Sequence, residues 1–240
     1  MIIFLVVNCP TDNIDKQKGI SYGSILNQQT FILYVIPWLM FSLVNFLSVP
    51  IQMDMLDKTT IETYMMIEAA LAGIFAVVAG FLSDIIGRKR VTISGFVLLG
   101  IGYAILGISQ GILGIPGDNP LIWFLYTVVD GIAWGIFSVI FIMTIWGDLS
   151  YGGSCEKYYA LGGIPFFISN FLRILVGPLI ASGTDSQTMG AAIFSLTAFF
   201  LFMAVLPLMF APETLPEKRI KERELRKYIS AAQKAKKKYA

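Results

Sequence analysis

Six runs of about 20 mostly apolar residues dominate this chain of 240 residues. An α-helix rises about 1.5 Å per residue, so about 20 residues cross the roughly 30 Å hydrocarbon core of a bilayer. A chain this short would not enclose six such runs in a soluble core. The sequence therefore predicts an all-α membrane protein with six transmembrane helices. The predicted spans are residues 30–51, 64–83, 91–114, 120–146, 159–182 and 189–211.

The composition agrees with a membrane-embedded chain and excludes several kinds of enzyme site. Hydrophobic residues make up 56% of the chain and charged residues 14%, against about 45–50% and about 25% in ordinary soluble domains. The chain contains no histidine, which excludes histidine-ligated metals and a Ser-His-Asp triad. It also lacks a phosphate-binding GxxxxGK[ST] loop and a cluster of metal ligands. We expect no enzymatic activity, no cofactor and no metal. Cys9 and Cys155 form no CxxC motif, and we expect two free thiols.

Basic residues are divided very unequally between the two predicted sides of the membrane. Ten of the 18 Lys and Arg residues lie after Pro216, and six lie in the N-terminal segment and in the loops after the second and fourth spans. Lys58 alone lies on the other side. The positive-inside rule therefore predicts a multi-pass protein of the cell membrane with both termini in the cytoplasm. With a net charge of only +2, we expect no nucleic-acid partner.

This topology divides the chain into three parts. Residues 1–27 form a cytoplasmic N-terminal segment, residues 28–212 form the six-helix bundle, and residues 213–240 form a basic cytoplasmic tail helix. The tail either is a solvated segment that enforces the topology or docks on anionic lipid headgroups.

Ionisable residues inside the predicted spans are the main candidates for a solute or coupling site. Each charge at the centre of a span costs roughly 2.5–3.5 kcal/mol to insert. Asp130 and Arg173 lie at similar depths, so they form either a pair that faces a cavity or a structural neutralising pair. Glu68 is either a protonatable coupling carboxylate or a water-exposed rim residue. Asn45 and Asn170 lie deep enough to line a polar path.

The tryptophans fall into two groups by depth. Trp38 and Trp134 lie deep in their spans, where they line the same polar path or pack in the core. Trp123 and Trp146 lie near opposite ends of the fourth span, as expected of anchors at the membrane interface.

The loop between the second and third spans carries the most specific motif of the chain. Residues 80–90 read GFLSDIIGRKR, and the leading glycine permits close helix approach. Asp84, at a helix C-terminus, needs a cation or another helix N-terminus as partner. Gly87 permits a tight turn and Arg88 can fork onto a carboxylate, such as Asp148 at the cytoplasmic end of the fourth span. The loop is either a gating latch or a basic turn that only sets topology. The candidate gating residues are Gly80, Asp84, Gly87, Arg88, Lys89 and Asp148.

This loop resembles the signature of the major facilitator superfamily, in which a glycine precedes an aspartate by four residues and Gly-Arg-Arg/Lys follows. Ile85 stands where the family usually has a basic residue. Two weaker resemblances are Gly177-Pro178 in the fifth span and the sequence APETLP over 211–216, which is similar to the segment after the last helix of many members, notably sugar porters. Residues from about 22 to 216 resemble one six-helix repeat, similar to a C-terminal half of the archaeal type.

The resemblance implies a function, because family members place two six-helix bundles around a central cavity. It implies a half-sized transporter of a small solute that works by alternating access, as a dimer or with a second six-helix half from another chain. The loop would hold the halves together when the cytoplasmic side is closed. The alternative is an accessory or assembly subunit of a membrane complex that transports nothing.

Overall fold

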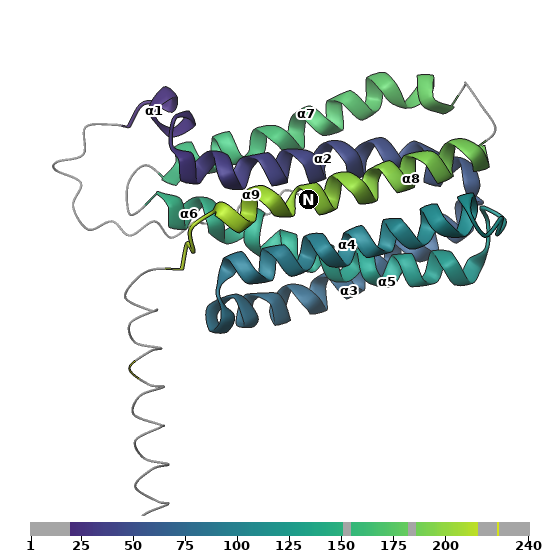
Figure 1. The fold of residues 1–240 in the computed structure, drawn as a ribbon, viewed down its shortest axis with the longest axis horizontal. Coiled ribbons are helices and arrows are strands. Elements are labelled where there is room, and N and C mark those ends of the chain that lie inside the picture. The colour runs from purple at the N-terminus through teal and green to yellow at the C-terminus, as the bar shows by residue number, and fades with distance from the viewer. Residues whose placement is uncertain (1–19, 151–154, 182–185, 216–224, 226–240) are drawn as a thin grey trace, which may run out of the picture.

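The computed structural model describes residues 20–150, 155–181, 186–215 and 225, and every regular element in this part of the chain is a helix (Figure 1). The predicted all-α class is confirmed to this extent. The elements are α1 (Tyr22–Leu26), α2 (Gln29–Met55), α3 (Lys58–Ile86), α4 (Arg88–Gly111), α5 (Pro120–Phe137), the π-helix η1 (Ser138–Thr144), α6 (Ile145–Leu149), α7 (Cys155–Ala181), α8 (Ser186–Met203) and α9 (Val205–Phe210).

Five helical segments of the described residues are long and apolar enough to cross a membrane. Three of them are α2, α3 and α4; the fourth joins α5, η1 and α6, and the fifth joins most of α8 to α9. The remaining predicted span corresponds to α7, which has 27 residues and packs along α2. The predicted multi-pass membrane protein is therefore compatible with the fold.

Polar residues in the short turns cap the N-termini of two of these helices. The Asp57 carboxylate accepts a hydrogen bond from the backbone N–H of Thr60 at 3.0 Å and caps α3. Asn119 caps α5, in which Pro120 takes the first position. Gly87 alone joins α3 to α4 with φ of 101°, a conformation that favours glycine.

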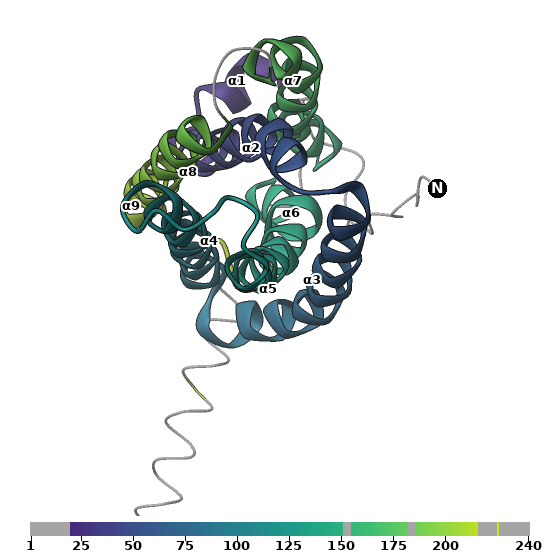
Figure 2. The same ribbon diagram turned by 90° about the vertical axis from the view of Figure 1, so that its right-hand side faces the viewer.

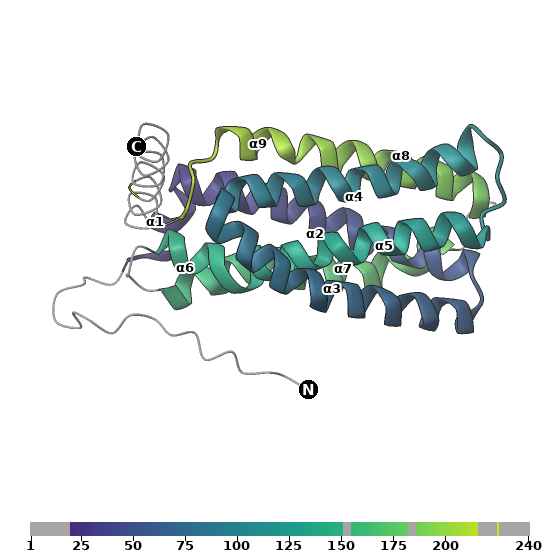
Figure 3. The same ribbon diagram turned by 90° about the horizontal axis from the view of Figure 1, so that it is seen from below.

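The long helices run along the longest axis of the molecule (Figure 3). Viewed from one end, α7 lies beyond α2 on one side of the bundle, and α3 lies on the periphery beside α5 (Figure 2). Glycine makes the closest of these contacts possible. A Cβ atom on Gly135 of α5 would lie 2.7 Å from the carbonyl oxygen of Ala72 and 2.8 Å from the backbone nitrogen of Ala76 in α3. Small residues thus bring the α3 and α5 backbones together, as in other membrane bundles.

An aromatic cluster fills the middle of the bundle and contains two of the tryptophans. Trp38 stacks on Phe141 at 4.7 Å between ring centroids, and its indole N–H donates to the carbonyl of Gly162 at 2.9 Å. Trp38 therefore packs in the core and lines no polar path. Trp146 packs on Phe31 and is 1% exposed, so the prediction of an interfacial anchor is wrong for this residue.

The two ends of the bundle are distinguished by the turns that they carry. The α2–α3 end carries the turns between α2 and α3 and between α4 and α5, and the α3–α4 end carries Gly87 and residues 211–215 (Figure 1). The short helix α1 also lies at the α3–α4 end, whereas the predicted tail helix, Leu225 apart, lies outside the described residues from 216 on. Cys155 is disulfide-bonded, so the expectation of a free thiol is wrong for that residue. Cys9 lies outside the described residues.

Candidate functional site: an intramembrane cavity and a charged cluster

A cavity of about 220 Å³ lies between α2, α3, α5 and α7. It lies toward the α2–α3 end, because its lining comes from the last part of α2, the first part of α3 and much of α5. The lining residues are Phe46, Val49, Gln52, Met53, Leu56, Ile61, Tyr64, Met65, Glu68, Trp123, Tyr126, Thr127, Asp130, Trp134 and Arg173.

Helical periodicity explains why these side chains meet. On α5, Trp123, Thr127, Asp130 and Trp134 follow the spacing i, i+4, i+7 and i+11, which places them on one helix face. The lining residues of α3 repeat every three to four positions in the same way. Each helix therefore turns one face to the cavity, and Gly135 holds α5 close to α3 beside it.

The three ionisable residues predicted inside the spans all line this cavity, each from a different helix. Glu68 comes from α3, Asp130 from α5 and Arg173 from α7. Asp130 is 5% exposed, and its Oδ1 atom has no hydrogen-bond partner in the described part of the chain. Arg173 lies over the ring of Phe46, with 5.7 Å between the guanidinium carbon and the ring centroid.

Asp130 and Arg173 share the cavity without forming the direct pair that their equal depth suggested. Within the described residues, neither Asp130 nor Glu68 has a carboxylate oxygen within 4.0 Å of the Arg173 guanidinium. Opposite charges on one cavity that do not touch leave room for a third group between them.

A hydrogen-bond network supports the cavity wall. Gln52 donates to the hydroxyl of Tyr126 at 3.2 Å and to that of Ser48 at 3.3 Å, and the hydroxyl groups of Ser48 and Tyr103 lie 2.8 Å apart. The network ties α2 to α4 and α5. Sequence reasoning missed Gln52 because it lies one residue beyond the predicted first span, where polar residues are unremarkable.

The remaining candidates differ in their relation to the cavity. Asn170 is half-buried on α7 but is not among the lining residues, and the side chain of Asn45 lies outside the described part of the structure. Trp134 lines the cavity, as one of the two alternatives held. Trp123, expected as an interfacial anchor, is 2% exposed; it lines the cavity and donates its indole N–H to the carbonyl of Gly117 at 2.6 Å.

A second group of charges, here called the Arg88 cluster, lies at the α3–α4 end and consists of Asp84, Arg88, Asp148 and Glu213. Arg88 and Asp148 form an ion pair, with side chains only 9% and 13% exposed. Asp84 is 51% exposed, and its oxygen lies 3.9 Å from the same guanidinium. Arg88 of the same motif is thus a cation partner of Asp84, as expected, and Asp148 of α6 contacts the same guanidinium.

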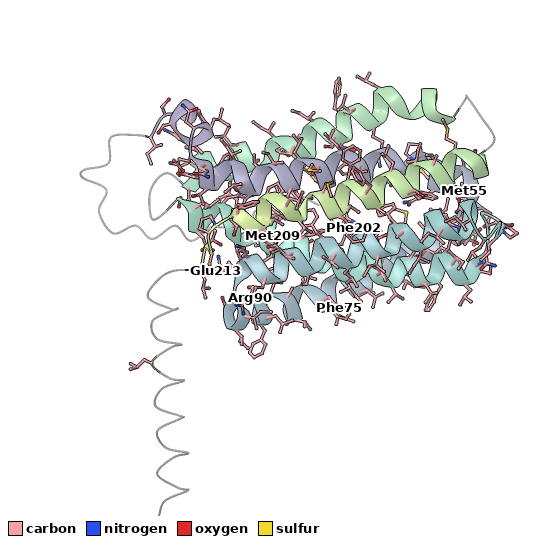
Figure 4. All side chains as sticks on the ribbon, in the orientation of Figure 1. Met55, Phe75, Arg90, Phe202, Met209 and Glu213 are labelled. Atoms are coloured by element: carbon pink, nitrogen blue, oxygen red, sulfur yellow. The ribbon has the colours of Figure 1, made fainter. Side chains whose placement is uncertain are left out.

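Glu213, which sequence reasoning did not single out as a site residue, caps the N-terminus of α4. Its Oε1 atom accepts hydrogen bonds from the backbone N–H of Arg88 at 2.9 Å and of Lys89 at 3.4 Å, as well as from Thr214 and Leu215. A carboxylate is stabilised there by the positive end of the helix dipole. A Cβ atom on Gly87 would collide with the Glu213 carboxylate. The signal for this contact was the Pro-Glu-Thr segment after the last predicted span. Glu213 lies at the same end of the bundle as Arg90 and Met209 and opposite Met55 (Figure 4).

The remaining gating candidates behave differently from one another. The Lys89 ammonium donates to the carbonyl of Met209 at 2.7 Å and so ties α4 to the end of α9. Gly80 lies apart from the cluster. A Cβ atom there would lie 3.9 Å from Val139, an ordinary van der Waals distance, so the close helix approach expected at Gly80 is not seen.

Comparison with known proteins gives no match: no family model, no curated protein and no solved structure is similar to this chain. Functional inference therefore rests on the two groups of charges and on the arrangement of the helices.

Proposed function

We propose that this chain is one six-helix half of a major-facilitator-like membrane transporter. It carries a small solute by alternating access, as a dimer or with a partner half, and α7 is its sixth span. Both termini lie in the cytoplasm, which makes the α3–α4 end the inner end and the α2–α3 end the outer one. The observation that carries the proposal is the gathering of Glu68, Asp130 and Arg173 on one cavity.

Insertion energetics favour a binding role for this cavity over a structural one. Insertion of each charged residue into a membrane costs roughly 2.5–3.5 kcal/mol. Three such residues are unfavourable in a helix bundle that has only a structural role. A structural solution would pair the charges directly, as Arg88 and Asp148 are paired at the other end. The cavity charges are not paired in this way, and a polar solute is the partner that a transporter brings to them.

The helix pairings also support the proposal, because they repeat between the two halves of the bundle. The first three spans are α2, α3 and α4, and they correspond in order to the last three, which begin with α5, α7 and α8. When each helix is replaced by its counterpart, the contact of α2 with α7 becomes that of α5 with α3. The same exchange converts the contact of α2 with α8 into that of α5 with α4, and it leaves the contact of α4 with α8 unchanged. Such internal repeats of three helices are typical of transporters, whose binding sites lie where the repeats meet.

A second half has a surface to occupy beside the cavity. Helix α3 exposes Met66, Val77 and Phe81 at 69%, 76% and 68%, although it contributes Glu68 to the cavity. A Cβ atom on Gly73 of the same helix would meet nothing within 4 Å. In the proposed assembly, a second copy or a partner half lies against this side of α3 and closes the cavity from the opposite wall.

The Arg88 cluster fits the role of an inner latch. It joins the α3–α4 turn to α6 through the pair of Arg88 with Asp148, and to the segment after α9 through Glu213. The cavity lies toward the opposite end of the bundle. With the cluster formed, the structure corresponds to a state closed inside, and opening of the inner end requires these contacts to break.

Reconstitution tests the proposal directly. Proteoliposomes that contain only this chain are loaded with unlabelled amino acids, sugars or organic cations, and counterflow of the labelled solute is measured. We expect counterflow of one class and its loss in D130N, whereas E62Q, which removes an exposed charge of α3, retains it. Absence of counterflow in every class, with the chain folded, would rule out transport by a dimer of this chain and leave a separate partner half or the accessory-subunit alternative.

A further inference from the structure

The cavity presents charges of both signs that face the same volume without touching. Asp130 and Glu68 contribute two carboxylates, and Arg173 contributes one guanidinium. A direct contact between opposite charges is strongly favourable in the low effective dielectric constant of a protein interior. The described residues contain no such contact between these groups, and Arg173 packs on Phe46.

The acidic side of the cavity offers unused hydrogen-bonding capacity. Asp130 is 5% exposed, and its Oδ1 atom has no partner in the part of the chain that the structure describes. A buried acceptor without a hydrogen bond is unfavourable, and more so when it is charged. An ammonium group donates three hydrogen bonds and would satisfy Asp130 and Glu68 together.

The basic side of the cavity offers hydrogen-bond donors for a carboxylate. A guanidinium presents N–H donors in a planar fork that fits a carboxylate through two parallel bonds. Arg173 comes from α7, which lies on the opposite side of the bundle from α5, the helix of Asp130 (Figure 2). A carboxylate seated here would therefore lie on the other side of the cavity from the ammonium.

We infer that the cavity binds a small zwitterion of the α-amino acid type, with its ammonium group at Asp130 and Glu68 and its carboxylate at Arg173. This inference rests on the proposed function and names its substrate class. The volume of about 220 Å³ suits a molecule of this size and is below the roughly 300–1,000 Å³ of pockets for drug-sized ligands. Trp123 and Trp134 supply apolar walls for the ligand's side chain.

Ligands with a single charge fit the same cavity less well. An anion meets two carboxylates for one guanidinium, whereas a cation leaves Arg173 without a partner and is repelled by it. An uncharged solute satisfies neither sign. The expected order of affinity is therefore zwitterion, then cation, then anion.

Binding to the full chain in detergent micelles tests the inference without requiring transport. L-phenylalanine, L-leucine and L-glutamine are titrated against the wild-type chain by calorimetry, with quenching of tryptophan fluorescence as a second readout. Each is compared with its amide, which lacks the carboxylate, and with the matching acid that lacks the amino group. At least one amino acid should bind about tenfold or more tightly than both of its analogues, a difference of about 1.4 kcal/mol.

Substitutions assign the two ends of the ligand. R173Q should weaken binding of the amino acid about tenfold or more and should not weaken binding of its amide, because the carboxylate contact is lost while the repulsion of the cation by Arg173 is removed. D130N should weaken both. The matched controls are K58Q and E62Q, which remove the exposed pair Lys58–Glu62 at the same end of the bundle, with side chains 90% and 66% exposed; these should change nothing.

Two results would overturn the inference: an amide or deaminated acid that binds as tightly as its amino acid, or failure of all three amino acids to bind the folded wild-type chain. Both measurements use the unmodified chain, so a variant that fails to fold does not affect them. Counterflow of sugars or organic cations without amino-acid binding would overturn the inference and leave the proposed function standing. Selective amino-acid binding without counterflow of any solute would leave the inference standing and rule out transport by this chain alone.

Discussion

The two ends of the bundle treat their charges in opposite ways. At the α3–α4 end, Arg88 is paired with Asp148, and Glu213 receives backbone hydrogen bonds from the start of α4. At the α2–α3 end, Asp130 and Arg173 line one cavity and form no ion pair with each other. Charges that hold a protein together are satisfied within the chain, whereas the charges that we propose bind a solute are not paired with each other. Stability measurements should therefore separate the two groups.

The largest expected effect on stability comes from breaking the buried pair. D148N removes the carboxylate of Asp148 from the Arg88 guanidinium, which is 9% exposed. We expect a loss of about 3 kcal/mol in the free energy of unfolding, measured by denaturant titration in detergent. D84N is the control, because Asp84 is half exposed and lies 3.9 Å from Arg88; it should cost no more than about 1 kcal/mol. Equal losses in the two variants would contradict the assignment of the close pair.

A second prediction concerns the turn that holds the Arg88 cluster together. G87A should lower the free energy of unfolding by about 2 kcal/mol, since alanine is strained at φ of 101°. The added methyl group would also push the Glu213 carboxylate away from the start of α4. G73A serves as control, because Gly73 is helical and open, and alanine there should be neutral or stabilise by up to about 1 kcal/mol. A neutral G87A would argue that the turn relaxes freely.

Removal of the charge of Glu213 should have a smaller effect. E213Q keeps an acceptor oxygen for the N–H groups of Arg88 and Lys89 but loses the charge at the helix N-terminus. We expect a loss of about 1 kcal/mol by the same titration. E62Q, in an exposed pair, should lie within about 0.5 kcal/mol of the wild type. A loss in E62Q as large as that in E213Q would show that the cap contributes nothing specific.

The smallest effect on stability is expected in the cavity, where the effect on function is largest. D130N replaces a buried carboxylate whose Oδ1 atom lacks a hydrogen bond with a neutral group of the same shape. The free energy of unfolding should stay the same or rise by about 1 kcal/mol, while counterflow is lost. A marked loss of stability in D130N would instead identify Asp130 as a structural residue and remove the contrast between the two ends.

Much of the candidate site could be predicted because depth in a membrane follows from counting along a helix. Counting placed Asp130 and Arg173 at one depth, and both line the cavity. The direction in which each helix faces its neighbours did not follow. Trp38 and Trp134 lie at comparable depths in their spans, yet one packs in an aromatic core and the other lines the cavity.

The amino-acid sequence by itself determined that the chain is helical, that several of its helices are long and apolar enough to span a membrane, and which charges lie inside them. These properties depend on the length and apolarity of local segments. A segment's transfer from water to lipid depends on its own residues and does not require the rest of the fold. Tertiary structure alone decided which charges meet. Glu213 caps a helix that begins 125 residues earlier in the chain. The cavity charges come from three separate helices whose rotation is set by side-chain packing.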